Sequence, residues 1–219
     1  QGGVVSPILS NIYLHHVVDT WFEEEVRPTL RGKGAMVRYA DDIMVKCSSE
    51  CDARMVLDKL KARLAEYELT VNTEKTRLVC FCKPANEQQA RTTQTIDFLG
   101  LTHYWGKTRN GGWTIKRRTM AKRLRRAKVN IWQWSKKHRH SKLSEQHEVL
   151  SAKLRGHYNY YGIRCNYEQM QSLYHFTVGT WMRWLRKRSS KHRLNWKKFT
   201  EKILKTFPLP KPKILLSWV

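Results

Sequence analysis

The chain has 219 residues, and its hydrophobic content of 41% is enough for a buried core and too high for a disordered protein. Its net charge of +24 is uneven, because residues 101–219 hold 29 of the 42 Lys and Arg residues but only 4 of the 18 Asp and Glu residues. The resulting net charge of +25 predicts a polyanionic partner, nucleic acid above all. The alternative is a solvated basic face with no partner, which would repel itself strongly.

The five cysteines are an odd number, and the sequence shows no secretory signal and no transmembrane run. These features predict reduced thiols in a cytoplasmic protein without a membrane partner. A zinc site from Cys47, Cys51, Cys80 and Cys82 with His103 is a weaker alternative, because paired Cys-x-x-Cys motifs are absent.

Apolar residues recur at helical spacing over residues 7–26, which predicts an amphipathic helix. Two short β-forming runs follow, at residues 35–38 and 43–45, with a turn between them. Ser49 is then a good N-cap for a second helix at about residues 50–67. Two helices packed on an antiparallel hairpin predict an α+β fold.

Further strands are expected at residues 77–82 and 96–105, and Asn110-Gly111-Gly112 carries a strong hairpin-turn signal. Beyond residue 116 the pattern is helical and basic. Helices are predicted at residues 117–138, 144–161, 167–188 and 193–205, followed by an extended basic tail with three prolines. The predicted domains are therefore 1–115, mixed α and β, and 116–219, all-α.

Two adjacent acids, Asp41 and Asp42, lie in the predicted turn between the first two strands. The simplest interpretation is a tight turn that happens to use two aspartates. The alternative is a metal site, because carboxylates at a hairpin turn can hold divalent cations against a triphosphate.

Five sequence blocks, taken in order, favour the metal site. They are residues 1–11 (QGGVVSPILSN), 39–42 (YADD), 69–76 (LTVNTEKT), 98–101 (FLGL) and 154–162 (LRGHYNYYG). Together the blocks resemble the reverse transcriptases, also called maturases, that bacterial group II introns encode. The resemblance implies part of a polymerase palm, an antiparallel sheet with packed helices, followed by a helical thumb or maturase-specific domain X.

The resemblance implies RNA-directed DNA synthesis at a site with two Mg²⁺ ions. Asp41 and Asp42 would be metal ligands and catalytic residues, and Lys75 would neutralise or protonate the departing pyrophosphate. A further aspartate of the family lies on an earlier strand. Because the chain begins at the first block, we expect the metal site to be incomplete and this chain alone to be inactive.

The resemblance also assigns substrate contacts. Those to nucleotide, template and primer fall on Gln1, Gly2, Tyr39, Ala40, Phe98, Leu99 and Gly100. Those to RNA are expected at Lys122, Arg123, Arg125, Arg126, Lys128, Arg155, His157 and Tyr158, although the aromatic rings of the last block could equally be core. The implied partners are group II intron RNA, an RNA template with a DNA primer and deoxynucleoside triphosphates, and either a separate N-terminal half or a second copy of the chain.

Two other functions remain open. One is an RNA-binding splicing factor whose palm is only structural, because maturase work needs the basic thumb but no metal chemistry. The other is a reverse transcriptase adapted to bacterial defence.

Overall fold

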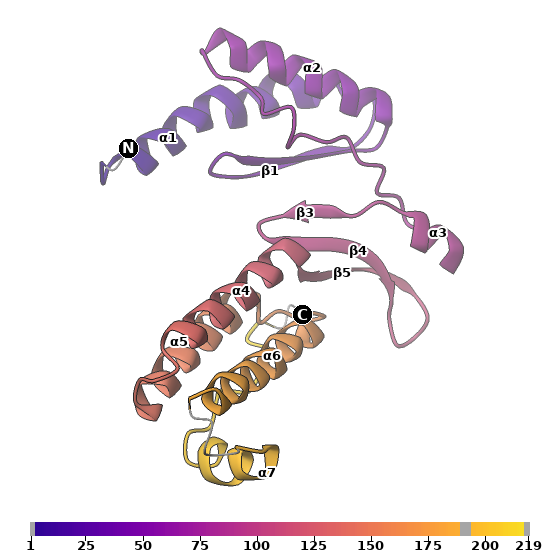
Figure 1. Ribbon diagram of the computed structural model, residues 1–219. Coiled ribbons are helices and arrows are strands. Elements are labelled where there is room, and N and C mark those ends of the chain that lie inside the picture. Colours follow the sequence, from indigo (N-terminus) through magenta and orange to yellow (C-terminus); the bar gives the residue numbers. More distant parts are fainter. Residues whose placement is uncertain (1–2, 189–193, 217–219) are drawn as a thin grey trace. The chain divides into compact units, whose positions relative to one another are not determined.

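The computed structural model describes residues 3–188 and 194–216, so the predicted contacts of Gln1 and Gly2 lie outside the described residues. The chain divides into two compact units, Gln1–Leu99 and Gly100–Val219. The chain contains both helices and short antiparallel sheets (Figure 1), which confirms the predicted α+β class. Among the described residues, none of the helices combines the length and the apolar character that a membrane span requires.

The first unit begins with a continuous helical stretch that is only partly α-helical. Helix α1 (Ser6–Leu14) runs into the π-helical segments η1 (His15–Thr20) and η2 (Phe22–Val26) and ends in the 3-10 turn η3 (Arg27–Thr29). The π-helical part is the buried part, because Val17, Val18 and Phe22 have almost no exposed surface. The side chains that anchor this helix to the unit therefore come from its second half.

Strands β1 (Gly34–Tyr39) and β2 (Asp42–Cys47) form an antiparallel hairpin, and helix α2 (Glu50–Glu66) follows (Figure 1). As predicted, Ser49 caps α2, because its hydroxyl accepts a hydrogen bond from the amide of Asp52 at 3.1 Å. Met36 and Val45 pair across the hairpin and pack against the cluster that contains Trp21 and Val56. Both helices thus bury one face of the hairpin.

The remainder of the first unit departs from the prediction at two places. Residues 77–82 form no strand; helix α3 (Glu87–Thr92) and strand β3 (Ile96–Phe98) follow them. The single strand predicted over residues 96–105 is interrupted, because Leu99 and Gly100 both have positive φ, 49° and 74°. Two successive residues of this conformation reverse the chain and cannot continue an extended strand.

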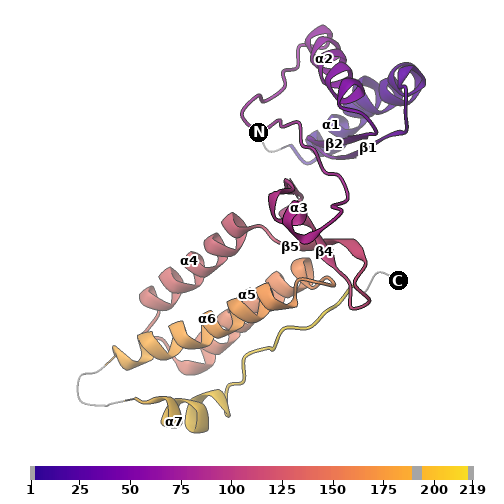
Figure 2. The ribbon, with the colours of Figure 1, turned by 90° about the vertical axis from the view of Figure 1, so that its right-hand side faces the viewer.

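The second unit combines one hairpin with three long helices (Figure 2). Its elements are β4 (Leu101–Lys107), β5 (Trp113–Thr119), α4 (Ala121–Lys137), α5 (Leu143–Tyr161) and α6 (Tyr167–Arg186). The predicted turn at Asn110-Gly111-Gly112 joins β4 to β5, and Gly111 adopts a φ of 79°. The apolar sides of the helices face one another around fully buried Leu150, Leu154 and Trp181.

Asn166 attaches the hairpin to the helices. It is fully buried at the start of α6, where its Oδ1 accepts a hydrogen bond from the amide of Thr119 at 2.8 Å. Its Nδ2 donates to Thr119 Oγ1 and to the carbonyl of Tyr161, both at 2.8 Å. Because these bonds bind β5 to the helices, the hairpin belongs to the second compact unit. The division therefore falls before the predicted boundary between residues 115 and 116, and the assignment of palm and thumb stays a prediction.

The C-terminal part returns along the helices. Helix α7 (Trp196–Lys198) continues into π-helical η4 (Phe199–Leu204), and an extended tail follows at residues 208–216 (Figure 2). The tail is fixed at both ends: the carbonyl of Pro208 lies 2.9 Å from His147 Nε2, and the amide of Leu215 donates to the carbonyl of Gly162 at 2.7 Å. The predicted extended tail is thus part of the folded unit.

Candidate active site and nucleic-acid interface

The two predicted metal ligands lie at the tight turn of the first hairpin. Tyr39 and Asp42 are paired in register, so that only Ala40 and Asp41 form the turn. Ala40 has a φ of 53°, and positive φ at the first of two central turn residues is the mark of a type II′ turn, which suits the twist of a hairpin. The turn leaves both aspartates exposed to solvent.

Arg38 holds this turn in place. It lies on the hairpin face that packs against the helices, and its Nη1 donates to the carbonyl of Ala40 at 3.0 Å. Its Nε and Nη2 donate to the two carboxylate oxygens of Asp19 at 2.7 and 2.6 Å, and Nη1 also donates to Asn11 Oδ1 at 3.1 Å. One guanidinium therefore fixes the turn to both α1 and η1. Two parallel bonds to one carboxylate are a geometry that lysine could not reproduce.

The Arg38–Asp19 pair also fixes the charge state of both groups. The hydrogen bond from Arg38 lowers the pKa of Asp19, and the same bond raises the pKa of Arg38. The Asp19 carboxylate therefore stays ionised and accepts from Arg38 across the physiological pH range. Asp41 and Asp42 accept no hydrogen bond and form no ion pair with any described residue, so their oxygens are available to a ligand.

The open face of the hairpin carries the predicted substrate residues. Because opposed residues of an antiparallel pair point to the same side, Tyr39 and Asp42 share the face away from the helices. The Tyr39 side chain is 66% exposed, and Val37 on the same face is 51% exposed. An exposed aromatic and aliphatic surface thus lies directly beside the two carboxylates.

The predicted primer-binding residues form the turn between β3 and β4. Phe98 and Leu99 are half-buried, and Gly100 has positive φ. A Cβ atom at Gly100 would lie 2.8 Å from Tyr161 Oη, so this position requires glycine on two grounds. Lys75 is exposed in a turn, where its amide donates to Asn72 Oδ1 at 3.1 Å. Among the described residues, no hydrogen bond or ion pair joins Lys75 to Asp41 or Asp42.

The predicted RNA-binding cations of α4 cover one side of that helix. Four of them are exposed, namely Lys122, Arg123, Arg125 and Arg126. Lys128 is half-buried, and its Nζ donates to Ser172 Oγ on α6 at 2.9 Å. The apolar side, with Leu124 and Ile131, packs in the core, so Lys122, Arg123 and Arg126 face solvent, whereas Lys128 points toward α6.

The block 154–162 is mainly structural, and this corrects one predicted RNA contact. Tyr158 is only 4% exposed and packs in the core with Leu154 and Leu150, one and two helical turns before it. Its ring cannot reach RNA in this structure. Burial lowers the pKa of His157 to about 4, so at neutral pH its imidazole is uncharged beside the ring of Tyr161. Arg155 is exposed, as predicted for a phosphate contact.

A comparison with known protein families finds a similarity in the first part of the chain. Residues 1–103 match the family model of the reverse transcriptases (RNA-dependent DNA polymerase). No curated protein matches the chain. The reverse transcriptase match covers the hairpin with Asp41 and Asp42, Lys75, and the turn at Leu99 and Gly100.

The reverse transcriptase segment holds oxygen ligands of the kind that Mg²⁺ prefers. The fit is partial: two exposed, unpartnered aspartates are adjacent at one turn, but no cluster of three or more His, Cys, Asp or Glu that could hold a metal ion occurs among the described residues. Asp41 and Asp42 can therefore provide part of a magnesium site, and ligands from substrate phosphates or another segment would have to complete it.

The helix residues that hold the β1–β2 hairpin in place could not be predicted from the sequence. Asp19 and Asn11 come from a helix far away in the sequence, and helical spacing alone gives no sign of their contact with Arg38. The sequence does contain one feature that could have predicted the role of Arg38. It stands at an inward-facing position of a short strand, between apolar Val37 and exposed Tyr39, and an inward arginine needs an acidic partner.

Proposed function

We propose that the chain carries the catalytic turn of an RNA-directed DNA polymerase of the group II intron type, and that its second unit binds intron RNA as a maturase. The observation that carries the proposal is the pair of unpartnered carboxylates on an Arg38-fixed turn, inside a segment that matches the reverse transcriptases. The basic face of α4 and the resemblance of residues 154–162 to domain X support the RNA-binding half.

The roles of the residues follow from their positions. Asp41 and Asp42 would hold magnesium, which when bound activates a primer 3′-hydroxyl and neutralises the departing pyrophosphate. Arg38 fixes the backbone of the turn that carries both aspartates, through its bond to the carbonyl of Ala40. Tyr39 offers an exposed ring on that face, against which a primer or nucleotide can pack.

The test replaces both aspartates by their uncharged isosteres, Asp41→Asn with Asp42→Asn. Both side chains are exposed, so we expect unchanged thermal stability and a large loss of Mn²⁺ binding, measured by water-proton relaxation on the 219-residue chain. In a protein that also carries the earlier strand of the family, primer extension on an RNA template should fall by at least about 10³-fold, which corresponds to about 4 kcal/mol of transition-state stabilisation.

The matched control is a charge reversal on the thumb, Arg123→Glu with Arg126→Glu. It should leave Mn²⁺ binding intact and abolish RNA binding, because two carboxylates then face phosphate. The second candidate function is a splicing factor with a structural palm. Splicing of the cognate intron at low magnesium distinguishes this function from that of a polymerase. That candidate gains support if primer extension is absent from the unaltered protein while splicing depends on Arg123 and Arg126.

A further inference from the structure

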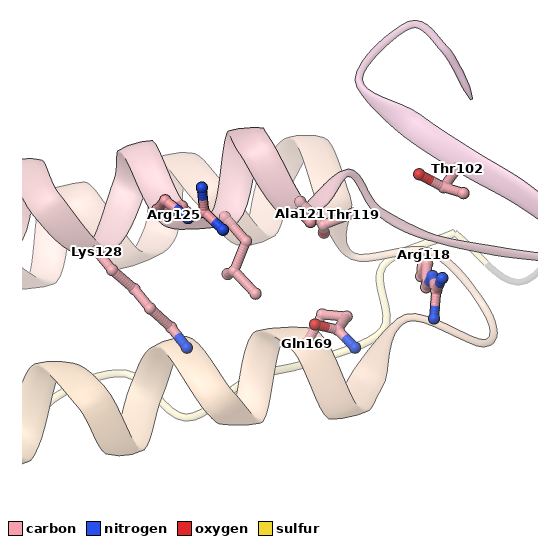
Figure 3. Close-up of a pocket in the computed structure, with 8 residues that line it drawn as sticks. Thr102, Arg118, Thr119, Ala121, Arg125, Lys128 and Gln169 are labelled. Atoms are coloured by element: carbon pink, nitrogen blue, oxygen red, sulfur yellow. The ribbon is translucent and has the colours of Figure 1, made fainter.

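A cavity of about 410 Å³ lies inside the second unit, between the hairpin β4–β5, the start of α4 and the facing side of α6 (Figure 3). Three cationic side chains line it, Arg118 from β5 and Arg125 and Lys128 from α4. Gln169 of α6 and the hydroxyl-bearing Thr102 and Thr119 supply its neutral polar wall. The cavity therefore combines three positive charges with groups that donate or accept hydrogen bonds.

The three cations have no carboxylate bonded to them in the described part of the chain. Neither Arg118, Arg125 nor Lys128 forms an ion pair with a carboxylate among the described residues. Glu168, the acid next to Gln169 in sequence, is exposed and comes within ion-pair distance of none of the three. Three like charges around one cavity repel one another, and an anion in the cavity would remove that repulsion.

The cavity is held in shape before any ligand arrives. Arg118 lies over the ring of Tyr104, 5.0 Å from its centre, and Lys128 Nζ is held by Ser172 and lies 5.6 Å from the ring of Phe176. The Thr119 hydroxyl is fixed by Asn166. Because these side chains are already ordered, less conformational entropy is lost when a ligand binds.

We propose that this cavity is a subsite for one phosphodiester group of a nucleic-acid strand. Its cationic donors suit phosphate oxygens, and its volume exceeds what a lone phosphate ion would fill. The exposed Lys122 and Arg126 continue the positive surface along α4, where the neighbouring phosphates of a strand would lie. The inference rests on the proposed function, which assigns RNA to this unit.

The experiment measures the affinity of the 219-residue chain for a short fluorescein-labelled single-stranded RNA at several KCl concentrations. The variant is Arg125→Gln with Lys128→Gln, and the control is Lys202→Gln with Lys205→Gln, which removes the same charge from exposed positions outside the cavity. Loss of one phosphate contact should reduce the slope of log K against log salt by about 0.7 and weaken binding roughly fivefold at about 0.1 M salt. The control should keep the slope and affinity of the unaltered chain.

The possible results separate the two levels of the proposal. If the unaltered chain binds RNA and the variant and control weaken it equally, the subsite is wrong and the proposed function stands. If the unaltered chain does not bind RNA, both fail. A calorimetric titration with inorganic phosphate tests a third possibility. If phosphate binds as tightly as RNA, and its binding requires Arg125 and Lys128, the cavity is a site for a free anion and the proposal of a nucleic-acid strand is wrong. Should the double variant lose its circular dichroism signal, Arg125→Gln alone, at an exposed side chain, carries the same expectation.

Discussion

At the scale of single residues, the two units are each held by a polar side chain that makes several hydrogen bonds. Arg38 does this in the first unit, and Asn166 does it in the second, where it joins the end of β5 to the loop between α5 and α6. Both make bonds to backbone groups and to side chains at once. Such residues are hard to replace, because removal leaves buried donors and acceptors without partners.

We therefore predict that Asn166→Ala destabilises the second unit by about 3 kcal/mol. The substitution removes three hydrogen bonds and leaves the amide of Thr119 buried without an acceptor, each such loss costing about 1–3 kcal/mol in part offset by relaxation. Urea denaturation followed by circular dichroism measures the free energy of unfolding.

The control for this prediction is Asn159→Ala. Asn159 is exposed on α5, so its substitution should change the free energy of unfolding by less than about 0.5 kcal/mol. Equal effects of the two substitutions would show that the network around Asn166 contributes nothing specific.

At the scale of elements, the sequence predicted the long helices well and the chain reversals poorly. The helix expected at 50–67 has its predicted cap at Ser49, and those expected at 144–161 and 167–188 appear as α5 and α6. The helical spacing of their apolar residues depends only on residues close in sequence, so it predicts these helices without knowledge of the tertiary fold. The turn at Leu99 is different, because leucine has no preference for positive φ, and the conformation is imposed by the surrounding fold.

The candidate site divides in the same way. The adjacent acids and their turn could be predicted from the sequence, because the whole pattern lies within residues 39–42 and is local. The contact of Asp19 with Arg38 and the burial of Tyr158 could not, because each depends on how elements distant in sequence pack. Tyr158 has the same spacing from its helix neighbours whether it faces a protein core or RNA.

Gly156 within α5 and Gly162, which directly follows α5, allow a prediction about this element. A Cβ at Gly162 would lie 2.4 Å from the carbonyl of Tyr158 and 3.0 Å from that of Lys213, whereas a Cβ at Gly156 meets nothing within 4 Å. Gly162→Ala should therefore displace the tail and destabilise the unit by about 2 kcal/mol. Gly156→Ala should stabilise it by up to about 1 kcal/mol, because alanine favours the helix.

Thermal unfolding of the two glycine variants provides the measurement, with limited proteolysis to report on the tail. Faster cleavage within residues 208–216 is expected for Gly162→Ala and not for Gly156→Ala. A stable Gly162→Ala protein with a protected tail would contradict the close packing described at this position.

At the scale of the whole molecule, charge distinguishes the two units. The first is nearly neutral and contains ion pairs such as Arg38–Asp19 and Arg54–Glu50. The second carries a net charge of about +25, and none of its four acidic residues forms an ion pair with a described residue. Its positive charges are therefore uncompensated within the fold, which destabilises the folded state by self-repulsion.

We expect added salt to stabilise the second unit selectively. Raising KCl from about 0.05 to about 0.5 M shortens the screening length from roughly 14 to roughly 4 Å and should weaken the repulsion. Hydrogen exchange resolved by peptide would then show slower exchange in α4, α5 and α6 but little change in α2. Equal responses in both units would mean that self-repulsion does not limit the stability of the second.

The returning tail has a consequence for how the protein is made. The first unit is built from one continuous stretch of chain, so it can fold as soon as that stretch has left the ribosome. The second unit cannot fold when its long helices have just left the ribosome, because Leu209 fills its core and Leu215 bonds to Gly162, and both are translated after those helices. A nascent chain therefore carries its basic helices without the tail until residues 208–216 have been made, and a polyanion such as a nearby RNA would meet the helices before the tail has closed over α5.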